Sequence, residues 1–166
     1  MINNQANFFE IFGINIEFDV DKNKISDEYL LLQKQYHPDK ATSAKEQVMF
    51  SEFSAYCNKA LKTLESDVER AIYILKLNHI ALEDYANERH ILESVWLDYE
   101  KFEEMHSTEE LQSFYQDKIQ ERKDLLAKLV TLFKINIVEA GKYTMLLKYL
   151  SNLIHNIKSK IDQLKI

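Results

Sequence analysis

Two stretches in the first half of the chain carry apolar residues at helical spacing. In residues 21–36 these positions recur at intervals of four, three and four: Ile25, Tyr29, Leu32 and Tyr36. In residues 43–64 they recur at three, four, three and four: Phe50, Phe53, Cys57, Ala60 and Leu64. Each pattern places its apolar residues on one face of an amphipathic helix. Two such faces joined by a short connection predict an antiparallel helical hairpin.

The connection holds the only proline in 166 residues, in the sequence Tyr36-His37-Pro38-Asp39-Lys40. Proline lacks a backbone N–H and disfavours helical geometry in the residue before it, so the first helix must stop at His37. Its start has two candidate caps, Asp19 and Asp21. The bend is stiff and carries the imidazole of His37 and the carboxylate of Asp39. Such side chains are better suited to contact a cation of another protein than to be buried.

Short helices are predicted on both sides of the hairpin. Before it, an aromatic-rich cluster that ends at Gly13 indicates a short helix that packs on something larger. The cluster consists of Phe8, Phe9, Ile11, Phe12 and Ile14. After the hairpin, Ser66 and Glu69 have the spacing of a capping box and open a helix that ends near Leu77.

The second half of the chain predicts a three-helix bundle. Periodicity is lost over residues 78–86, where we expect a linker, and resumes over 88–106 with Ile91, Val95 and Phe102 on one stripe. A second capping box, Ser107 and Glu110, opens a helix that runs past Leu132. Its apolar positions can face the preceding helix; they include Leu111, Ile119, Leu126, Leu129 and Phe133. The last helix carries one apolar face: Tyr143, Leu146, Leu150, Leu153, Ile157, Ile161 and Leu164.

The turn between the last two helices has two candidate positions. Gly141 has the residue type of a helix C-cap, whereas residues 134–136 are suited to an earlier turn. With only two glycines, one proline and no strand-length alternation of apolar and polar residues, the whole chain is predicted to be all-α.

Composition excludes several classes of function. A net charge of −6 argues against nucleic-acid binding, and no apolar run reaches membrane-spanning length, so we expect a cytoplasmic protein with no membrane partner. Cys57 is the only cysteine and lies on an apolar stripe, which favours a buried hydrophobe over a reactive thiol. The five histidines lack metal-ligand spacing, and no phosphate loop or nucleophile elbow occurs. We therefore expect no metal, no cofactor and no enzymatic activity.

Four segments together resemble a J-domain: Leu32-Gln33-Lys34-Gln35-Tyr36, His37-Pro38-Asp39-Lys40, Asn58-Lys59-Ala60 with Leu64, and Arg70-Ala71-Ile72-Tyr73-Ile74-Leu75. More narrowly, the chain looks like the HscB type, the co-chaperone of iron-sulfur cluster assembly, whose opening matches residues 8–13. The resemblance implies an L-shaped arrangement of two domains. Residues 1–77 are then the J-domain, 78–86 the linker, and 87–166 a three-helix scaffold-binding domain.

By this resemblance the chain docks on a DnaK/HscA-type chaperone and speeds its ATP hydrolysis. The implied contact residues are His37, Pro38, Asp39, Lys34 and Lys40. Asp39 is offered to an arginine of the chaperone. J-domains often carry a basic face on the helix before the loop, but here Asp27 and Glu28 intervene, so steering toward an acidic surface is weak. Stimulation is therefore predicted to depend more on Asp39 than on Lys34.

The resemblance also implies a second surface, for an IscU-type iron-sulfur scaffold protein. If Ile91, Val95 and Phe102 face the bundle, a neighbouring row on the same helix combines apolar anchors with carboxylates. The implied contact residues are Leu92, Trp96, Glu100, Glu104 and, from the last helix, Tyr149. The resemblance implies an apolar residue at position 93 and an acidic residue at position 97, but this chain has Glu93 and Leu97. The chain is expected to act as a monomer.

Other interpretations remain open at this stage. Trp96 can equally be a core aromatic of the bundle, and Tyr149 can pack beside Leu146 and Leu150. Asn58 is expected to satisfy backbone groups near the hairpin. His37 and Asp39 could form an acid-base pair in an enzyme, although the short loop offers no concave pocket. The second domain could also be an adaptor for a different client protein.

Overall fold

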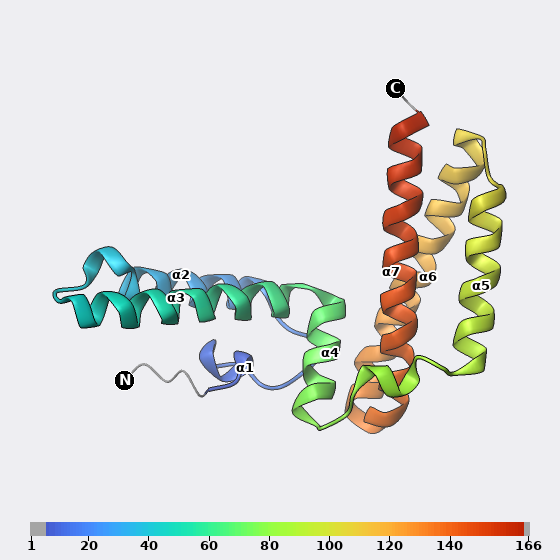
Figure 1. Cartoon of the computed structure of the whole chain (residues 1–166). Helices are drawn as coiled ribbons and strands as arrows, with labels where there is room; N and C mark the ends of the chain where they lie inside the picture. Colours follow the sequence, from blue (N-terminus) through green and yellow to red (C-terminus); the bar gives the residue numbers. More distant parts are fainter. Residues whose placement is uncertain (1–5, 165–166) are drawn as a thin grey trace. The chain divides into compact units, whose positions relative to one another are not determined.

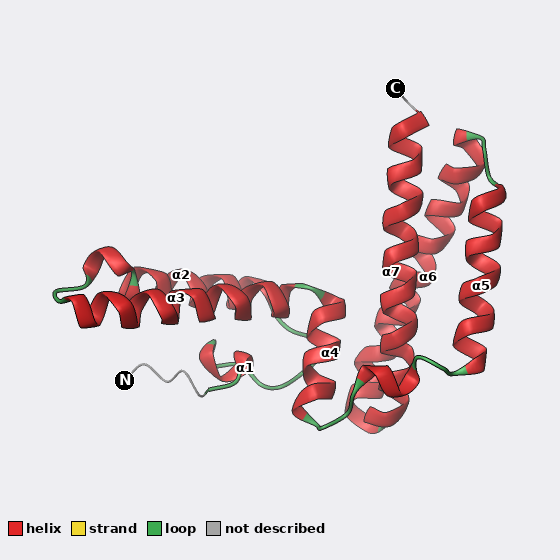
Figure 2. Cartoon of the chain, viewed as in Figure 1, coloured by secondary structure: helices red, strands yellow, loops and turns green. Residues whose placement is uncertain are grey.

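The computed structural model describes residues 6–164, and all regular structure in that range is helical (Figures 1 and 2). The chain ends, 1–5 and 165–166, lie outside the described residues. The helices in order are α1 (Phe8–Ile11), α2 (Lys22–Tyr36), η1 (Pro38–Lys40), α3 (Ala44–Glu65), α4 (Asp67–Leu77), η2 (Leu82–Tyr85), α5 (Arg89–Glu104), α6 (Thr108–Ile135) and α7 (Ile137–Leu164), where η denotes a 3-10 helix. The all-α prediction is confirmed. The chain divides into two compact units, one ending at Ile74 and one beginning at Leu75.

The first unit is built on the predicted hairpin of α2 and α3, which run side by side in Figure 1. Asp21, not Asp19, caps α2, because its carboxylate accepts hydrogen bonds from the backbone N–H groups of Asn23 and Lys24. The buried side chains come from the two predicted stripes: Ile25, Phe53, Cys57, Ala60 and Leu64. At the loop end, the Tyr36 ring lies edge-on to Phe53 at 5.0 Å between centroids. The hairpin and its apolar faces are thus confirmed.

Asn58 differs from its prediction. Its side-chain oxygen accepts a hydrogen bond of 2.6 Å from the Tyr29 hydroxyl, so its partner is a side chain of α2 and not the backbone. A second cross-helix hydrogen bond, of 3.0 Å, runs from the Ser54 hydroxyl to Gln33. These polar pairs join the rims of the two helices, outside the apolar stripe.

Helix α1 packs against the rest of the first unit through its aromatic residues, as predicted. Phe8, Phe9 and Phe12 are buried, and the Phe8 ring stacks on Tyr73 of α4 at 4.4 Å. Asn7 and Glu10 form a reciprocal capping box at the start of this single turn. Gly13 then has a φ of +58°, a left-handed conformation that a glycine adopts without the Cβ clash of other residues. The glycine therefore ends the helix for conformational reasons.

Arg70 of α4 binds three segments of the first unit together. Its side chain is buried, and its guanidinium donates to the carbonyl oxygens of Phe18 at 2.7 Å and Leu64 at 2.5 Å. A third hydrogen bond of 2.8 Å reaches the Asp67 carboxylate, which also pairs with Lys22. A buried guanidinium is stable only when its donors are satisfied in this way.

The segment after α4 is more ordered than a linker. His79 ends the helix in a left-handed conformation with a φ of 60°, and the Ile80 N–H donates to the Leu75 carbonyl oxygen, as in a Schellman motif. The 3-10 helix η2 follows, and its Leu82 and Tyr85 are buried in the second unit. The predicted segment 78–86 thus contributes apolar side chains to a core.

The second unit is a bundle of α5, α6 and α7. Helix α6 packs mainly along α7, and α5 also lies against α7, so only part of the apolar face of α6 meets the preceding helix. Phe102 of α5 joins a buried cluster that links all three helices, with Leu111, Phe114, Leu153, Ile157 and Ile161. The predicted face of α7 is otherwise buried or half-buried, but Leu164, in its last position, is exposed.

The turn between α6 and α7 lies at Asn136, the earlier of the two predicted positions. Asn136 separates the helices, and its side chain accepts a hydrogen bond from the Glu139 N–H at the start of α7. Gly141 is instead buried inside α7. A Cβ at Gly141 would overlap the ring of Tyr85, so the glycine is needed for close packing and not for a turn.

Candidate functional site

The docking loop, residues His37–Lys40, is held in shape by its own backbone. His37 has extended geometry with a ψ of 136°, and Pro38 begins the 3-10 turn η1. The Lys40 N–H donates to the His37 carbonyl oxygen at 2.9 Å, and the Ala41 N–H donates to that of Pro38 at 3.1 Å. The loop is therefore a defined turn, and it holds the backbone of Asp39 in one position.

The two functional groups of the docking loop have different roles in this geometry. Nδ1 of His37 accepts a hydrogen bond of 3.3 Å from the Asp39 N–H, so the imidazole caps the turn. The Asp39 side chain is 88% exposed, with its Oδ2 atom 3.5 Å from His37 Nδ1. An exposed carboxylate on a stiff turn is preorganised to accept hydrogen bonds from a guanidinium.

Lys34 lies in the last turn of α2, before the docking loop, and Lys40 is the last residue of η1 and of the loop. Both side chains are exposed. The structure thus brings together all five residues that the sequence predicted for this surface. His37 and Asp39 stand on an exposed turn and not in a cleft, which argues against the acid-base interpretation.

The second surface lies on α5. We call it the α5 surface and define it as Leu92, Trp96, Leu97, Glu100 and Glu104, all of which are exposed. The inner stripe of the helix is as predicted, with Ile91 and Val95 half-buried and Phe102 buried. Trp96 is 71% exposed, so the core interpretation of this residue is wrong.

The apolar part of the α5 surface borders a shallow hollow of about 800 Å³. Its lining residues are Leu92, Glu93, Val95, Trp96, Leu97 and Tyr99. Glu93 is held by an ion pair of 2.7 Å with Arg89, one turn earlier. The carboxylates of Glu100 and Glu104 follow on the next turns, so the surface is apolar at its start and acidic at its end.

Tyr149 of α7 does not line this hollow. It is half-buried in a neighbouring groove between α5 and α7, where Val95, Tyr99, Leu146 and Leu150 also lie. Burial, together with the neighbouring Tyr149, raises the pKa of the Tyr99 phenol. Tyr99 connects the two features because it lines both, and sequence reasoning did not single it out. Its spacing of four from Val95 and three from Phe102 was the available signal.

An ion cluster around the buried Lys118 joins α5 to α6, and the sequence did not predict it. Lys118 of α6 is buried and donates to Asp98 of α5 at 2.5 Å and to Glu121 at 2.7 Å. Burial by itself lowers the pKa of Lys118, but the hydrogen bonds to Asp98 and Glu121 raise it overall. The charged pair turns Asp98 toward the bundle, which leaves Trp96 and Leu97 on the outside.

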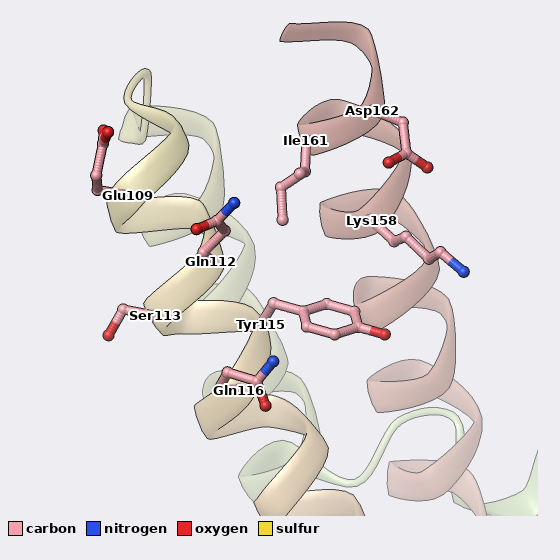
Figure 3. Close-up of a pocket in the computed structure, with 8 residues that line it drawn as sticks. All are labelled: Glu109, Gln112, Ser113, Tyr115, Gln116, Lys158, Ile161 and Asp162. Atoms are coloured by element: carbon pink, nitrogen blue, oxygen red, sulfur yellow. The ribbon is translucent and has the colours of Figure 1, made fainter. Parts of the chain in front are cut away.

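A pocket of about 570 Å³, lined mostly by residues with polar groups, opens between α6 and α7 (Figure 3). Tyr115 points from α6 toward α7, whereas Lys158 and Asp162 point away from α6, and Glu109 and Ser113 point away from α7 (Figure 3). Polar groups that do not converge cannot hold a small substrate in one orientation. Among residues 6–164 no group of three or more His, Cys, Asp or Glu side chains is placed to hold a metal ion.

None of the helices in the described part of the chain is long and apolar enough to cross a membrane.

Comparisons with known proteins agree with both units. Residues 99–158 match the family model described as the HSCB C-terminal oligomerisation domain. A co-chaperone protein HscB homolog from Vibrio cholerae is 34% identical over 109 residues, which is 64% of this chain and 60% of the relative. The chain thus spans about three fifths of that curated relative in this alignment.

Two further relatives cover almost the whole chain. A co-chaperone protein HscB homolog from Haemophilus ducreyi is 29% identical over 168 residues, covering 95% of this chain and 97% of the relative. The crystal structure of human co-chaperone protein HscB superposes with a TM-score of 0.87 at 27% identity, over 95% of this chain and 83% of that one. Sequence and fold together show that the chain is similar to HscB-type co-chaperones over almost its whole length, and they support its assignment to that type.

Proposed function

We propose that this co-chaperone delivers an IscU-type iron-sulfur cluster scaffold protein to a DnaK/HscA-type chaperone and stimulates the chaperone's ATP hydrolysis. In this proposal residues 1–77 are the J-domain, 78–86 connect the domains, and 87–166 bind the scaffold. The observation that carries it is the docking loop, which presents the exposed Asp39 carboxylate on a turn capped by His37.

The docking loop supplies a contact and no chemistry of its own. Asp39 accepts hydrogen bonds from an arginine of the chaperone, while His37 and Pro38 keep the turn in one geometry. Lys34 and Lys40 add weaker, solvent-screened contacts. Stimulation requires that these contacts are stronger in the hydrolysis-competent state of the chaperone than in its resting state.

The α5 surface supplies the second contact. Leu92 and Trp96 are apolar anchors for the scaffold protein, Glu100 and Glu104 accept hydrogen bonds from its cations, and Tyr149 contributes from the adjacent groove. Leu97 adds apolar area beside Trp96. Arg89 neutralises Glu93, so the attraction for cations is confined to the C-terminal half of the helix.

The test is the ATP turnover of the chaperone, measured with this chain, the scaffold protein and both. We expect stimulation by the chain alone and more than additive stimulation with the scaffold. Asp39→Ala should lower stimulation about tenfold or more, because an arginine of the chaperone loses its partner. Lys34→Ala, a charge removal on the same surface, should keep most of it. Equal losses in two folded variants would contradict the assigned role of Asp39.

Binding of the scaffold tests the second surface separately. Leu92→Ala combined with Tyr149→Ala, or with Trp96→Ala, should weaken the scaffold complex by about tenfold or more in a calorimetric titration. Leu164→Ala removes an exposed leucine from the same unit and is the matched control. Binding that is absent in the wild-type chain, or unchanged by these substitutions, would favour an adaptor for a different client.

A further inference from the structure

The outward face of α2 carries two large apolar side chains in water. Leu30 is 63% exposed and Leu31 is 59% exposed, whereas the opposite face of the helix packs on α3 through Ile25 and Tyr36. Neither leucine contributes to the buried core of the first unit. Adjacent exposed leucines on the solvent side of an amphipathic helix are typical of a protein-protein contact.

The register of α2 makes these leucines continuous with the docking loop. Leu30 and Leu31 precede Lys34 by four and three residues, and Lys34 precedes His37 by three. Residues at these spacings are neighbours on a helix surface. A partner that reaches Asp39 and approaches along α2 therefore meets the two leucines within the next helical turns.

The charges on this face are balanced. Lys24, Asp27 and Lys34 are exposed on the outward side of α2 with the leucines, Glu28 beside them is half-exposed, and the loop adds Asp39 and Lys40. Three positive and three negative side chains give this surface no net attraction for an acidic partner. Burial of the leucines is then the largest favourable contribution available beside the Asp39 contact.

We infer that Leu30 and Leu31 form the apolar half of the chaperone-docking surface, and that the chaperone covers α2 with an apolar patch and not with an acidic one. This inference rests on the proposed function, because it takes the partner of the docking loop as the occupant. In this view, burial of Leu30 and Leu31 provides most of the binding affinity for the chaperone, and the Asp39 contact causes the stimulation of ATP hydrolysis.

The experiment measures chaperone ATP turnover against the concentration of the full chain. Leu30→Gln with Leu31→Gln should raise the concentration for half-maximal stimulation about tenfold or more, because both side chains lose apolar area. Leu30→Met with Leu31→Met should stay close to wild type. Ile16→Gln, at an exposed apolar residue between α1 and α2, is the matched control and should have no effect. Circular dichroism verifies that all variants are folded.

Salt provides an independent measurement. Between about 0.05 and 0.5 M salt, the half-maximal concentration of the wild-type chain should change less than about threefold, because the charged contacts are few and exposed and the apolar contact is not screened by salt. A basic docking face would give a change of more than about tenfold over the same range. The unstimulated turnover of the chaperone at each salt concentration is subtracted.

The outcomes separate this inference from the proposed function. Stimulation that is lost in Asp39→Ala but unchanged in the double Gln variant, or that weakens steeply with salt, overturns the inference alone. No stimulation by the wild-type chain overturns both. A double Gln variant that changes only the sedimentation of the chain by itself, with stimulation intact, would show that a second copy covers the leucines, and the inference would be wrong.

Discussion

Cys57 illustrates how a single side chain follows from its position on a stripe. Its place between Phe53 and Ala60 predicted burial, and the thiol is 1% exposed. Burial raises the pKa of the Cys57 thiol from 9.0 to about 11. The thiol is therefore protonated in the folded chain at neutral pH, which removes the nucleophilic thiolate.

We predict that Cys57 resists thiol reagents in the folded chain. At pH 8 about 0.1% of a thiol with this pKa is ionised, so labelling by Ellman's reagent should proceed only through unfolded molecules. The chain in urea, where the thiol is exposed, is the control and should react at once. Rapid labelling under native conditions would show that the site is open.

The same shift predicts a loss of stability in base. Between pH 9 and 11 the folded chain keeps the Cys57 proton while the unfolded chain releases it, so the free energy of unfolding falls as pH rises. The loss is about 2 kcal/mol from this group. Cys57→Ala should show a flatter pH dependence in urea titrations, and identical slopes for the two proteins would refute the assignment.

Lys118 shows what local sequence rules miss. A lysine within an amphipathic helix is usually expected to be solvated, and the sequence around Lys118 does not indicate that it is buried. Its environment is created by Asp98 from another helix and by the Phe114 ring, 5.3 Å from its nitrogen. Contacts between distant segments decide such a position, so only the three-dimensional structure reveals it.

At the scale of elements, helix starts were predictable because capping is local. Ser107 was the predicted cap and Asp21 one of two candidates, and both accept hydrogen bonds from backbone N–H groups of their own helices. The turn before α7 was ambiguous because Asn136 and Gly141 both have residue types that end helices. In the structure Asn136 forms the turn between α6 and α7, whereas Gly141 lies inside α7 and allows close packing against Tyr85 of η2.

Gly141→Ala is predicted to destabilise the second unit, although alanine is the better helix former by about 1 kcal/mol. The added methyl group collides with the buried Tyr85 ring, and overpacking of this kind costs about 1–3 kcal/mol. In a Tyr85→Ala background the same substitution should become neutral or stabilising. Urea denaturation of the four proteins measures this coupling, and additive effects would contradict it.

At the scale of the whole molecule, the two proposed recognition surfaces lie on two different compact units. The docking loop belongs to the unit that ends at Ile74, and the α5 surface belongs to the unit that begins at Leu75. Both were predictable as positions in the sequence. Their exposure was not, because Trp96 had a core interpretation of similar merit until the bundle placed it outside.

If one molecule must bind the chaperone and the scaffold protein at the same time, a mixture of two variants that each lack one of these surfaces cannot replace the wild-type chain. We predict that an equimolar mixture of Asp39→Ala and the Leu92→Ala, Trp96→Ala double variant will not restore scaffold-dependent stimulation of the chaperone. Each molecule in the mixture binds one partner only, and delivery depends on the high effective concentration within one chain. The measurement is ATP turnover, with the wild-type chain at half the total concentration as the control. Recovery would indicate that the active species is an oligomer.

The exposed indole of Trp96 has a practical consequence, because it is the only tryptophan in the chain. Its fluorescence should already resemble that of an indole in water when the chain is folded, so unfolding should change the emission little. Covering it with the scaffold protein should shift the emission to shorter wavelength. We therefore expect the emission of Trp96 to respond to a partner on the α5 surface and to change little on unfolding. A blue-shifted spectrum of the free, folded chain would contradict this expectation.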